Sequence, residues 1–351
     1  MAQAENAKKL DYTPVTYDDQ YILMVNQLKK YFPIKGGLMS QTVGHVKAVD
    51  GVTFNLKRGH TMGLVGESGC GKSTTGRTIL RLAGEKTGGQ VLFNGKEVYD
   101  MTGRELRNLR TKMQIIFQDP FSSLSPRLPV GEIIGEAVRE HNLVPKAEFN
   151  DYIDQVMDNC GLQPYHKTRY PHEFSGGMRQ RVMIAMALAC EPDILIADEP
   201  TTALDVTIQA QILELMQSLQ KKLGMAIIMV THDLGVIADM CDEIIVMYGG
   251  RVCERGTAED IFYRPHHEYT KGLLRSIPNV DRIGEKLIPI PGTPINLLNM
   301  PKGCAFCPRC EEAMKICIEE QPPEMQMPDG HFASCWLNVK AAMEEEKGGR
   351  Q

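Results

Sequence analysis

Length, composition and charge indicate an ordinary globular chain and exclude several classes of protein. A chain of 351 residues suggests two or three domains, and 42% hydrophobic residues are enough for a packed core. The net charge of −5 gives no general affinity for nucleic acid, and we interpret one local basic run as the solvated face of a helix: Arg104, Arg107, Arg110 and Lys112.

The beginning of the sequence predicts neither secretion nor membrane insertion. Residues 1–20 form a polar tail without the apolar segment of a signal peptide. No apolar run approaches the roughly 20 residues that a membrane span needs. We therefore expect a chain made for the cytoplasm, where thiols stay reduced, so that the cysteines form no disulfide framework. Cys190, Cys241 and Cys253 stand among apolar residues and are predicted to be buried.

Strands and helices are predicted to alternate over most of the chain. In chain order we expect strands within 21–60 and over 61–65, a helix over 72–82, a hairpin over 91–98, a helix over 103–112, a loop over 119–130, amphipathic helix within 131–160, a helix over 182–189, a strand over 194–198, a helix over 202–223, a strand over 226–230 and a hairpin over 243–254. This alternation favours a parallel sheet that is covered by helices on both faces.

A glycine-rich segment after the predicted strand 61–65 predicts a phosphate site. Residues 66–73, GESGCGKS, fit the pattern G-x-x-x-x-G-K-[ST] between a strand and a helix. Glycines let backbone N–H groups surround phosphates, and the helix N-terminus adds its positive dipole end. Lys72 can reach the β- and γ-phosphates, and Ser73 can hold Mg²⁺. The predicted phosphate-binding residues are Gly66, Glu67, Ser68, Gly69, Cys70, Gly71, Lys72, Ser73 and Thr74, with Cys70 as a neutral filler.

A second motif, ILIADEP at 194–200, places two carboxylates at the end of a buried strand. Burying Asp198 costs free energy unless a cation accompanies it, and Mg²⁺ is the natural partner. Glu199 follows directly and is placed to polarise an attacking water. We therefore predict that this segment adds the metal ligand and the water-activating carboxylate to the phosphate site.

The segment FSGGM at 174–178 lies 20 residues before ILIADE and resembles the signature motif of ATP-binding cassette (ABC) proteins. The resemblance covers about residues 22–262. It departs from the usual L-S-G-G-Q at Phe174 and Met178, and Met178 removes an amide. The ABC resemblance implies roles for further residues. Gln118 is expected to sense Mg²⁺ and water, and His232 to act as the switch that contacts the γ-phosphate. Asp205 is expected at the dimer interface, and Ser175 and Gly177 are expected to act in trans on the partner's ATP. Tyr31 or Phe32 is expected to stack on the adenine, and of these we choose Phe32.

The resemblance also implies an architecture. It predicts an α/β fold with a RecA-like parallel sheet core, an antiparallel β subdomain and an inserted helical subdomain at about 119–178. The cassette is expected over 21–263 after the tail 1–20, and a small Cys-rich C-terminal extension over 264–351. An insertion at about 34–43 obscures the adenine-binding segment.

Five cysteines lie within 32 residues near the end of the chain: Cys304, Cys307, Cys310, Cys317 and Cys335. Their density argues against simple buried thiols. A zinc site and an iron–sulfur cluster both fit four cysteines, and the spacing does not separate them. Phosphoryl transfer needs no redox centre, so we expect the cysteines to fold a Pro-rich tail that is too short to build its own core.

The tail, together with RTKMQIIFQDPFSSLSPR and EPTTALDVTIQAQIL, resembles the ATPase subunits of oligopeptide and dipeptide ABC importers over nearly the whole chain. Some members carry a [4Fe–4S] cluster, and this resemblance implies Cys304, Cys310, Cys317 and Cys335 as its ligands. Cys307 departs from the family pattern and is an alternative ligand. Zn²⁺ remains the alternative to the cluster.

The resemblance implies an energy-coupling ATPase on the cytoplasmic side of the cell membrane, bound peripherally. Its expected partners are a second cassette, identical or different, two membrane permeases and an extracellular solute-binding protein that delivers peptides. A non-transport ABC ATPase acting on nucleic acid or the ribosome is the alternative. It is disfavoured by a single cassette, the absence of long heptads and the negative charge. An inactive scaffold is disfavoured because every catalytic residue type is present.

Overall fold

The computed structural model describes residues 12–36, 41–202, 204–276 and 289–348, which form two compact units. Unit 1 consists of Met1–Leu56, Leu64–Asp100 and Glu243–Gln351, and unit 2 of Lys57–Gly63 and Met101–Asp242. Strand β3 (Thr61–Val65) is divided between them and has the bounds that the sequence predicts. Much of the polar tail and part of the expected insertion lie outside the described residues.

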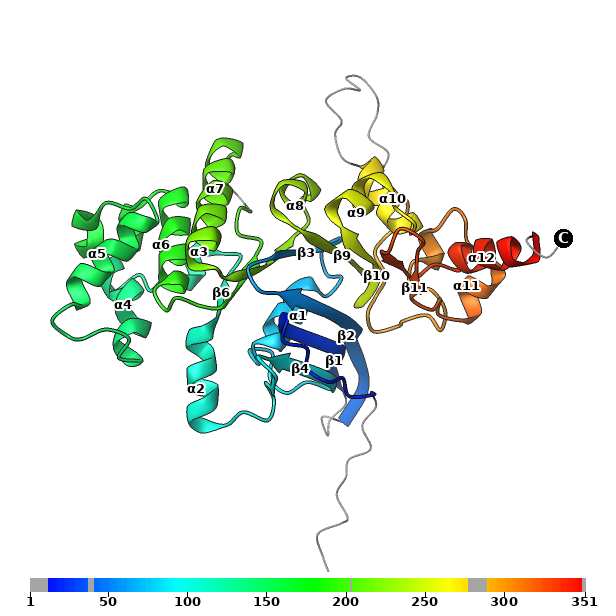
Figure 1. Cartoon of the computed structure of the whole chain (residues 1–351), viewed down its shortest axis with the longest axis horizontal. Helices are drawn as coiled ribbons and strands as arrows, with labels where there is room; N and C mark the ends of the chain where they lie inside the picture. The colour runs from blue at the N-terminus through cyan, green and yellow to red at the C-terminus, as the bar shows by residue number, and fades with distance from the viewer. Residues whose placement is uncertain (1–11, 37–40, 203, 277–288, 349–351) are drawn as a thin grey trace, which may run out of the picture. The chain divides into compact units, whose positions relative to one another are not determined.

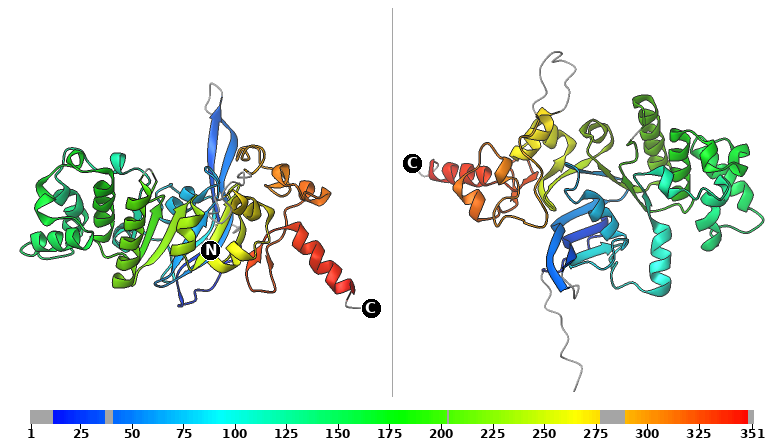
Figure 2. Two further views of the ribbon diagram at one scale, coloured as in Figure 1. Left: turned by 90° about the horizontal axis from the view of Figure 1, so that it is seen from above. Right: turned by 180° about the vertical axis from the view of Figure 1, so that it is seen from behind.

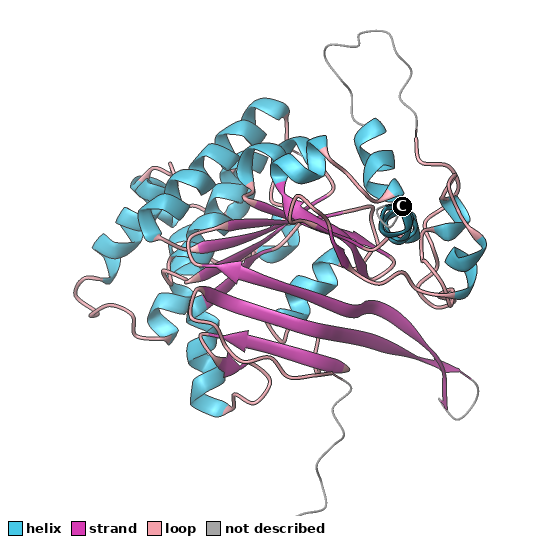
Figure 3. Ribbon diagram, turned by 45° about the vertical axis from the view of Figure 1, so that its right-hand side comes forward, coloured by secondary structure: helices cyan, strands magenta, loops and turns pink. Residues whose placement is uncertain are grey.

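Unit 1 contains a four-stranded sheet in the order β2-β1-β4-β5, and Figure 3 draws the strands in magenta. Its strands are β1 (Tyr21–Gly36), β2 (Gln41–Lys57), β4 (Gly88–Phe93) and β5 (Lys96–Glu97). β1 pairs with β4 in antiparallel fashion, with Leu23 opposite Phe93. Leu23, Val25 and Leu28 have no exposed surface, so one face of this sheet carries a core of unit 1.

The predicted hairpin over 91–98 is confirmed by its turn. Asn94 and Gly95 both have positive φ, 48° and 78°, and they connect β4 to β5. A two-residue turn of this kind matches the right-handed twist of the strands that it joins.

Two short strands near the end of the chain add to a hairpin that forms a second group of paired strands in unit 1. β9 (Glu243–Tyr248) and β10 (Arg251–Thr257) form the predicted closing hairpin. β10 also pairs with β12 (Phe332–Ala333), which pairs with β11 (Met325–Gln326). The residues after 263 therefore share backbone hydrogen bonds with the hairpin.

Most helices of unit 1 have eight residues or fewer, and several follow residue 263. They are α1 (Lys72–Ile79), α9 (Ala258–Tyr263), α10 (Glu268–Arg275), the 3-10 turn η4 (Cys307–Arg309), α11 (Lys315–Glu319) and α12 (Trp336–Gly348). Figure 2 shows α12 in red, leading to the C-terminus. Residues 289–301 contain no helix or strand, as their prolines predict.

Unit 2 contains the predicted parallel strands. β6 (Met113–Ile116), β7 (Ile194–Asp198) and β8 (Ala226–Thr231) are adjacent and parallel, with Ile194 opposite both Met113 and Ala226. Every residue of β7 and β8 is buried, which explains their continuous apolar sequence. The carboxyl ends of these three strands meet at one edge of the sheet.

The helices of unit 2 are α2 (Gly103–Lys112), α3 (Pro120–Ser123), α4 (Val130–Glu140), α5 (Phe149–Asn159), α6 (Gly176–Leu188), α7 (Val206–Leu223) and α8 (Leu234–Met240), with 3-10 turns η1 (Pro164–Thr168) and η2 (Pro171–Glu173). α4, α5 and α6 pack against one another, in the green part of Figure 1. α2 has the predicted bounds, and Gly224 ends α7 in a left-handed conformation, as predicted.

Several predicted helix boundaries are wrong, each for a local reason. α7 begins at Val206 rather than at 202, because the Asp205 side chain accepts the N–H of Ile208 as a cap. α1 ends at Ile79, since Arg81 has a φ of +56°. The predicted loop 119–130 contains α3 and the first residue of α4, and α6 begins six residues before 182. The amphipathic helix expected within 131–160 is present as two helices, α4 and α5.

Candidate functional site

The glycine-rich segment 66–73 forms a loop between β3 and α1 in unit 1, and its glycines are required by close backbone contacts. A Cβ atom at Gly71, where φ is +106°, would lie 2.2 Å from the Ala48 carbonyl oxygen. A Cβ atom at Gly66 would lie 2.2 Å from the carbonyl oxygen of Met247. The Cys70 carbonyl accepts the N–H of Gly250 at 2.9 Å. The loop is therefore held in shape by the main chain around it.

Lys72 lies inside the loop and is 4% exposed. Its Nζ donates to the carbonyl oxygens of Gly66 at 2.6 Å and Glu67 at 3.0 Å. Burial raises the pKa of the Cys70 thiol beside it, which favours the neutral thiol. The loop N–H groups, the Lys72 ammonium and the start of α1 form a set of hydrogen-bond donors that fits phosphate oxygens. The hydroxyl oxygen of Ser73, in the first turn of α1 with Thr74, is the loop's candidate ligand for Mg²⁺.

Glu67 of this loop is bound by residues from beyond 263, which the sequence analysis did not predict. The Arg309 guanidinium donates to both Glu67 carboxylate oxygens, at 2.5 and 3.0 Å. The Glu67 N–H donates to the Tyr269 hydroxyl at 2.7 Å. The partners are 242 and 202 positions away, and no sequence signal marks such contacts.

The predicted catalytic residues of unit 2 meet at the carboxylate of Glu199. Gln118 Nε2 donates to its Oε2 at 2.8 Å, and the Thr202 hydroxyl donates to the same oxygen at 2.9 Å. His232 Nδ1 lies 3.2 Å from Oε1. Because Gln118 and His232 follow β6 and β8, the parallel strands bring them to Glu199 at the end of β7. Thr202 is a member of this group that the sequence analysis missed.

The backbone of Glu199 is also constrained. Its φ of +50° lies in the left-handed region, and its N–H donates to the Val230 carbonyl at 2.7 Å. A non-glycine residue in this region is strained, which is common at functional sites. Asp198, one residue earlier, is 1% exposed at the last position of β7.

The remaining predicted residues of unit 2 lie at helix N-termini. Ser175 caps α6 by accepting the Met178 N–H at 3.4 Å, and Asp205 caps α7. A Cβ atom at Gly177 would lie 2.7 Å from Ile208 Cγ2, so this glycine also has a packing role. Ser175 is exposed and available to a ligand or a second chain.

The two candidates for the adenine platform differ in exposure. Phe32 on β1 is 39% exposed, and Lys30 Nζ lies 5.0 Å from its ring centroid. The neighbouring Tyr31 donates its hydroxyl to Asp50. Asp50 also accepts from Arg251 at 2.6 and 3.0 Å. Phe32 is exposed and has no hydroxyl that needs a hydrogen-bond partner, so it is the better candidate for stacking on adenine than Tyr31.

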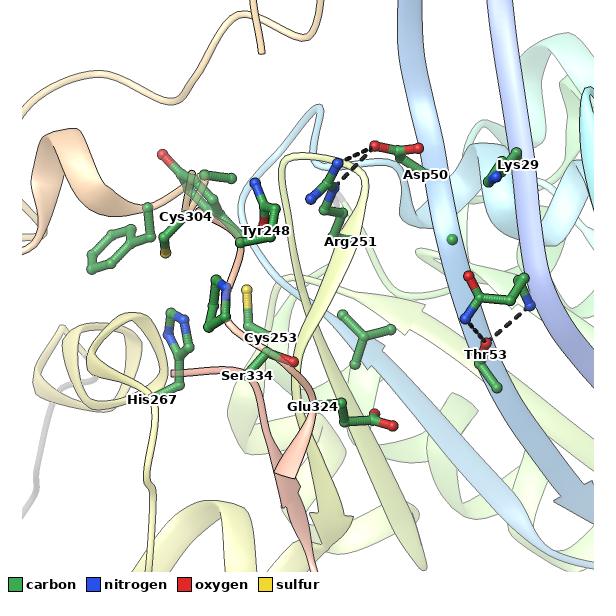
Figure 4. Close-up of a pocket in the computed structure, with 17 residues that line it drawn as sticks. Lys29, Asp50, Thr53, Tyr248, Arg251, Cys253, His267, Cys304, Glu324 and Ser334 are labelled. Carbon is green, nitrogen blue, oxygen red and sulfur yellow. Dashed lines mark hydrogen bonds and ion pairs between the residues drawn. The ribbon is translucent and has the colours of Figure 1, made fainter. Parts of the chain in front are cut away.

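A cavity of about 410 Å³ lies in unit 1 between β1, β2, β10 and the residues after 263. Figure 4 shows Lys29, Asp50 and Arg251 on one side of it and His267 and Cys304 on the other. Cys253, which is buried like Cys190 and Cys241 as predicted, also lines this cavity.

The five cysteines after 303 lie near one another in unit 1. The Cys304 N–H donates to the Cys317 carbonyl at 2.8 Å. Burial raises the pKa of Cys304 to about 11 and that of Cys310 to about 12, and the charge of Cys335 acts in the same direction on both. Within the described residues, no three cysteine sulfurs lie within 4.8 Å of one another.

A second polar cluster joins β10 to the end of the chain. The fully buried carboxylate of Glu254 accepts the N–H groups of His266 and His267, at 2.5 and 3.1 Å, and lies 3.2 Å from His331 Nε2. His331 Nδ1 lies 2.8 Å from Asp329. His266, Asp329 and His331 hold their ligand atoms within 4.8 Å, a grouping that could accept a cation. Sequence spacing gave no sign of it.

Two family profiles match the chain. The ABC transporter profile matches residues 49–202. The profile of the oligopeptide/dipeptide transporter C-terminal region matches residues 253–317.

Curated relatives match over nearly the full chain. The dipeptide transport ATP-binding protein DppD of Bacillus subtilis is 46% identical over 328 residues, covering 92% of this chain and 96% of that protein. The oligopeptide transport ATP-binding protein OppD of Salmonella typhimurium is 47% identical over 324 residues, covering 91% and 94%.

Solved structures with the same fold include two ATP-binding cassettes. The cbiO1 protein from Clostridium perfringens, part of the ABC transporter complex cbiONQ, has a TM-score of 0.59 at 32% identity and covers 70% of this chain and 92% of its own. The dimeric, post-hydrolysis cassette MJ0796 bound to ADP and Pi has a TM-score of 0.59 at 28% identity, with coverage of 67% and 98%.

Proposed function

The chain belongs to the ABC transporter family, among its dipeptide and oligopeptide transport ATP-binding proteins, and from this premise we propose that it hydrolyses ATP to drive import of peptides. The observation that carries the proposal is the Glu199 carboxylate, held by Gln118 and Thr202 and placed beside His232. The alternative of an ATPase acting on nucleic acid or the ribosome is not favoured by these relatives.

In this proposal the chain's residues divide the work of hydrolysis. The phosphate loop, with Lys72, would bind the triphosphate. Ser73 of unit 1 and Gln118 and Asp198 of unit 2 are the residues that would hold Mg²⁺, and the metal would neutralise the phosphate charge. Glu199 orients the attacking water and accepts its proton. His232 contacts the γ-phosphate, and its place beside Glu199 couples the two residues.

We propose that two cassettes close around the nucleotide. Ser175 and Gly177 contribute to the ATP of the partner cassette, and Asp205 lies at the interface between the two. The exposure of Ser175 at a helix N-terminus supports this role, because such a terminus favours anions. The solved relative MJ0796 is itself dimeric with ADP and Pi. Phe32 stacks on the adenine in this assembly.

The proposed partners are a second cassette, two permeases that cross the membrane and an extracellular solute-binding protein. No helix among the described residues is both long and apolar enough to cross a membrane. We propose that the chain is bound at the cytoplasmic face through the segment after Gln118, where Phe121 of α3 is 69% exposed.

We further propose that Cys304, Cys310, Cys317 and Cys335 hold a [4Fe–4S] cluster. Four cysteine thiolates are the ligand set of a [4Fe–4S] cluster and also of a structural zinc site, so Zn²⁺ is the alternative occupant. The gathering of these residues supports a shared site, because burial and then the charge of Cys335 raise the pKa of both Cys304 and Cys310. In this proposal the cluster stabilises the described part of an extension over 264–351, which follows the cassette of 21–263.

The hydrolysis proposal is tested on the chain purified with its permeases in lipid vesicles. ATP hydrolysis stimulated by a peptide-loaded binding protein, with uptake of labelled peptide, is the expected result. Hydrolysis that never depends on permeases, or that depends on added nucleic acid, would contradict it.

The cluster proposal is tested by analysis of iron, sulfide and zinc in anaerobically purified protein. We expect iron and sulfide, lost in Cys310→Ser and retained in the matched control Cys307→Ser. Stoichiometric zinc without sulfide would contradict the cluster, and loss of iron in Cys307→Ser alone would move the ligand set to Cys307.

A further inference from the structure

Glu67 brings a carboxylate to a phosphate-binding loop, where its negative charge lies in a site built for a triphosphate. Its side chain is one-quarter exposed, and its charge meets the guanidinium of Arg309, whose side chain is 4% exposed. The two groups make a two-pronged contact at 2.5 and 3.0 Å. This geometry is the strongest form of charge-assisted hydrogen bonding between these groups.

Arg309 is itself held in place from several directions. Its Nε donates to the Pro291 carbonyl at 2.7 Å, Nη2 donates to the Ile290 carbonyl at 3.3 Å, and Nη1 lies 3.3 Å from the Tyr248 hydroxyl. The residue ends the turn η4, between Cys307 and Cys310. A planar group with all its nitrogens engaged has little freedom to leave Glu67.

The backbone of Glu67 is tied to the same part of the chain. Its N–H donates to the Tyr269 hydroxyl at 2.7 Å, and Tyr269 on α10 has no exposed surface. Both the side chain and the main chain of one loop residue are therefore bound by residues beyond 263. The loop is built by the cassette but completed by the C-terminal extension.

We propose that Arg309 is a positioning residue of the nucleotide site: it neutralises Glu67 and holds its carboxylate in place, so that the loop can accept a triphosphate. This inference rests on the proposed ATP binding. Without Arg309, an unpaired negative charge would stand in the loop and repel the phosphates, because Coulomb repulsion at a few ångströms remains substantial near a protein surface. The extension thus acts on affinity for ATP and not on the chemical step.

The first test is Arg309→Gln, measured by binding of a fluorescent ATP analogue and by steady-state hydrolysis in the assembled transporter. We expect the Kd and KM for ATP to rise about tenfold, equivalent to about 1.4 kcal/mol, with kcat within about twofold of wild type. The matched control is Arg255→Gln, which breaks another two-pronged pair, Arg255–Glu324 at 2.8 and 3.2 Å, away from the loop. This control should leave the Kd for ATP unchanged.

The second test separates electrostatics from folding. In Glu67→Gln/Arg309→Gln the repelling charge is absent, so we expect ATP affinity to return to within about threefold of the Glu67→Gln single variant. A merely structural role of Arg309 predicts no rescue, since the lost contacts would remain lost. Unchanged affinity in Arg309→Gln, or a double variant as weak as Arg309→Gln alone, would overturn the inference. Failure of the wild-type chain to bind ATP would instead contradict the proposed function.

Discussion

The phosphate loop of unit 1 and the Glu199 group of unit 2 are held in shape by different kinds of contact. The Glu199 group consists of Gln118, Glu199, Thr202 and His232. Cys70, Gly71 and Lys72 of the loop are buried. Main-chain contacts that exclude a Cβ atom hold the loop's shape at Gly66 and Gly71. The Glu199 group depends on side-chain hydrogen bonds, and its member His232 has a side chain that is 58% exposed. We infer that ATP binding by the loop depends on its backbone shape. The activity of the Glu199 group depends instead on the chemical groups of its side chains, whose positions can adjust.

The largest expected effect tests the chemistry of the Glu199 group. Glu199→Gln keeps the side-chain shape but removes the base, so ATP hydrolysis should fall about a thousandfold while ATP still binds and closed dimers accumulate. Turnover and size-exclusion chromatography with ATP measure the two results. Glu214→Gln, at an exposed position of α7, is the control. Near-normal turnover in Glu199→Gln would rule out Glu199 as the base.

The next effect tests the shape of the loop. Gly71→Ala places a Cβ atom 2.2 Å from the Ala48 carbonyl at a φ of +106°, which should lower the free energy of unfolding by about 4 kcal/mol and abolish ATP binding. Gly69→Ala is the comparison, because φ is +78° but nothing lies within 4 Å of the added atom. Denaturant unfolding measures both, and equal losses would show that backbone strain alone, and not the close contact, decides the effect.

A smaller effect concerns how the free energy of unfolding depends on pH through His267. This residue caps α10 by accepting the Tyr269 N–H at 3.0 Å. Burial, and then the charge of Lys271, lowers the pKa of His267 from 6.5 to about 4. The unfolded chain therefore binds the extra proton between these pH values. Stability is complete above pH 6.5 and falls as the pH drops toward 4, by about 3 kcal/mol in total.

His267→Asn retains a capping oxygen and removes this titration. Unfolding in denaturant at pH 7.5 and pH 5 should show a smaller difference in the variant than in the wild type. His172→Asn, at an exposed position, should keep the wild-type difference. An unchanged pH dependence in His267→Asn would show that other groups account for it.

The smallest effect tests how adjustable the Glu199 group is. Thr202→Val removes one of the hydrogen bonds to Glu199 Oε2 without changing side-chain size. A single hydrogen bond of about 1 kcal/mol predicts about a fivefold loss of kcat with an unchanged Kd for ATP. Thr207→Val on the exposed face of α7 is the control. A loss as large as that of Glu199→Gln would mean that this group is as rigid as the loop.

Local signals made much of the fold predictable. β3, β7 and α2 have the predicted bounds because continuous apolar runs or helical periodicity identify them without long-range information. The predicted helix boundaries were wrong where a single side chain or a single dihedral angle decides where the helix begins or ends, as at Asp205 and Arg81. The gathering of Gln118 and His232 at Glu199 followed from parallel strand order, which the sequence pattern indicates. Thr202 was missed because a hydroxyl after a strand carries no distinctive signal.

The sequence by itself identified the phosphate loop, since its fixed glycines, lysine and serine are contiguous and stand between a predicted strand and a predicted helix. It also determined the parallel strands that end at Asp198 and Glu199. Only the tertiary structure decided that Glu67 would be held by Arg309 and Tyr269, which lie more than 200 positions away. Such contacts depend on how the end of the chain packs on unit 1, and packing is a property of the whole fold rather than of any local pattern.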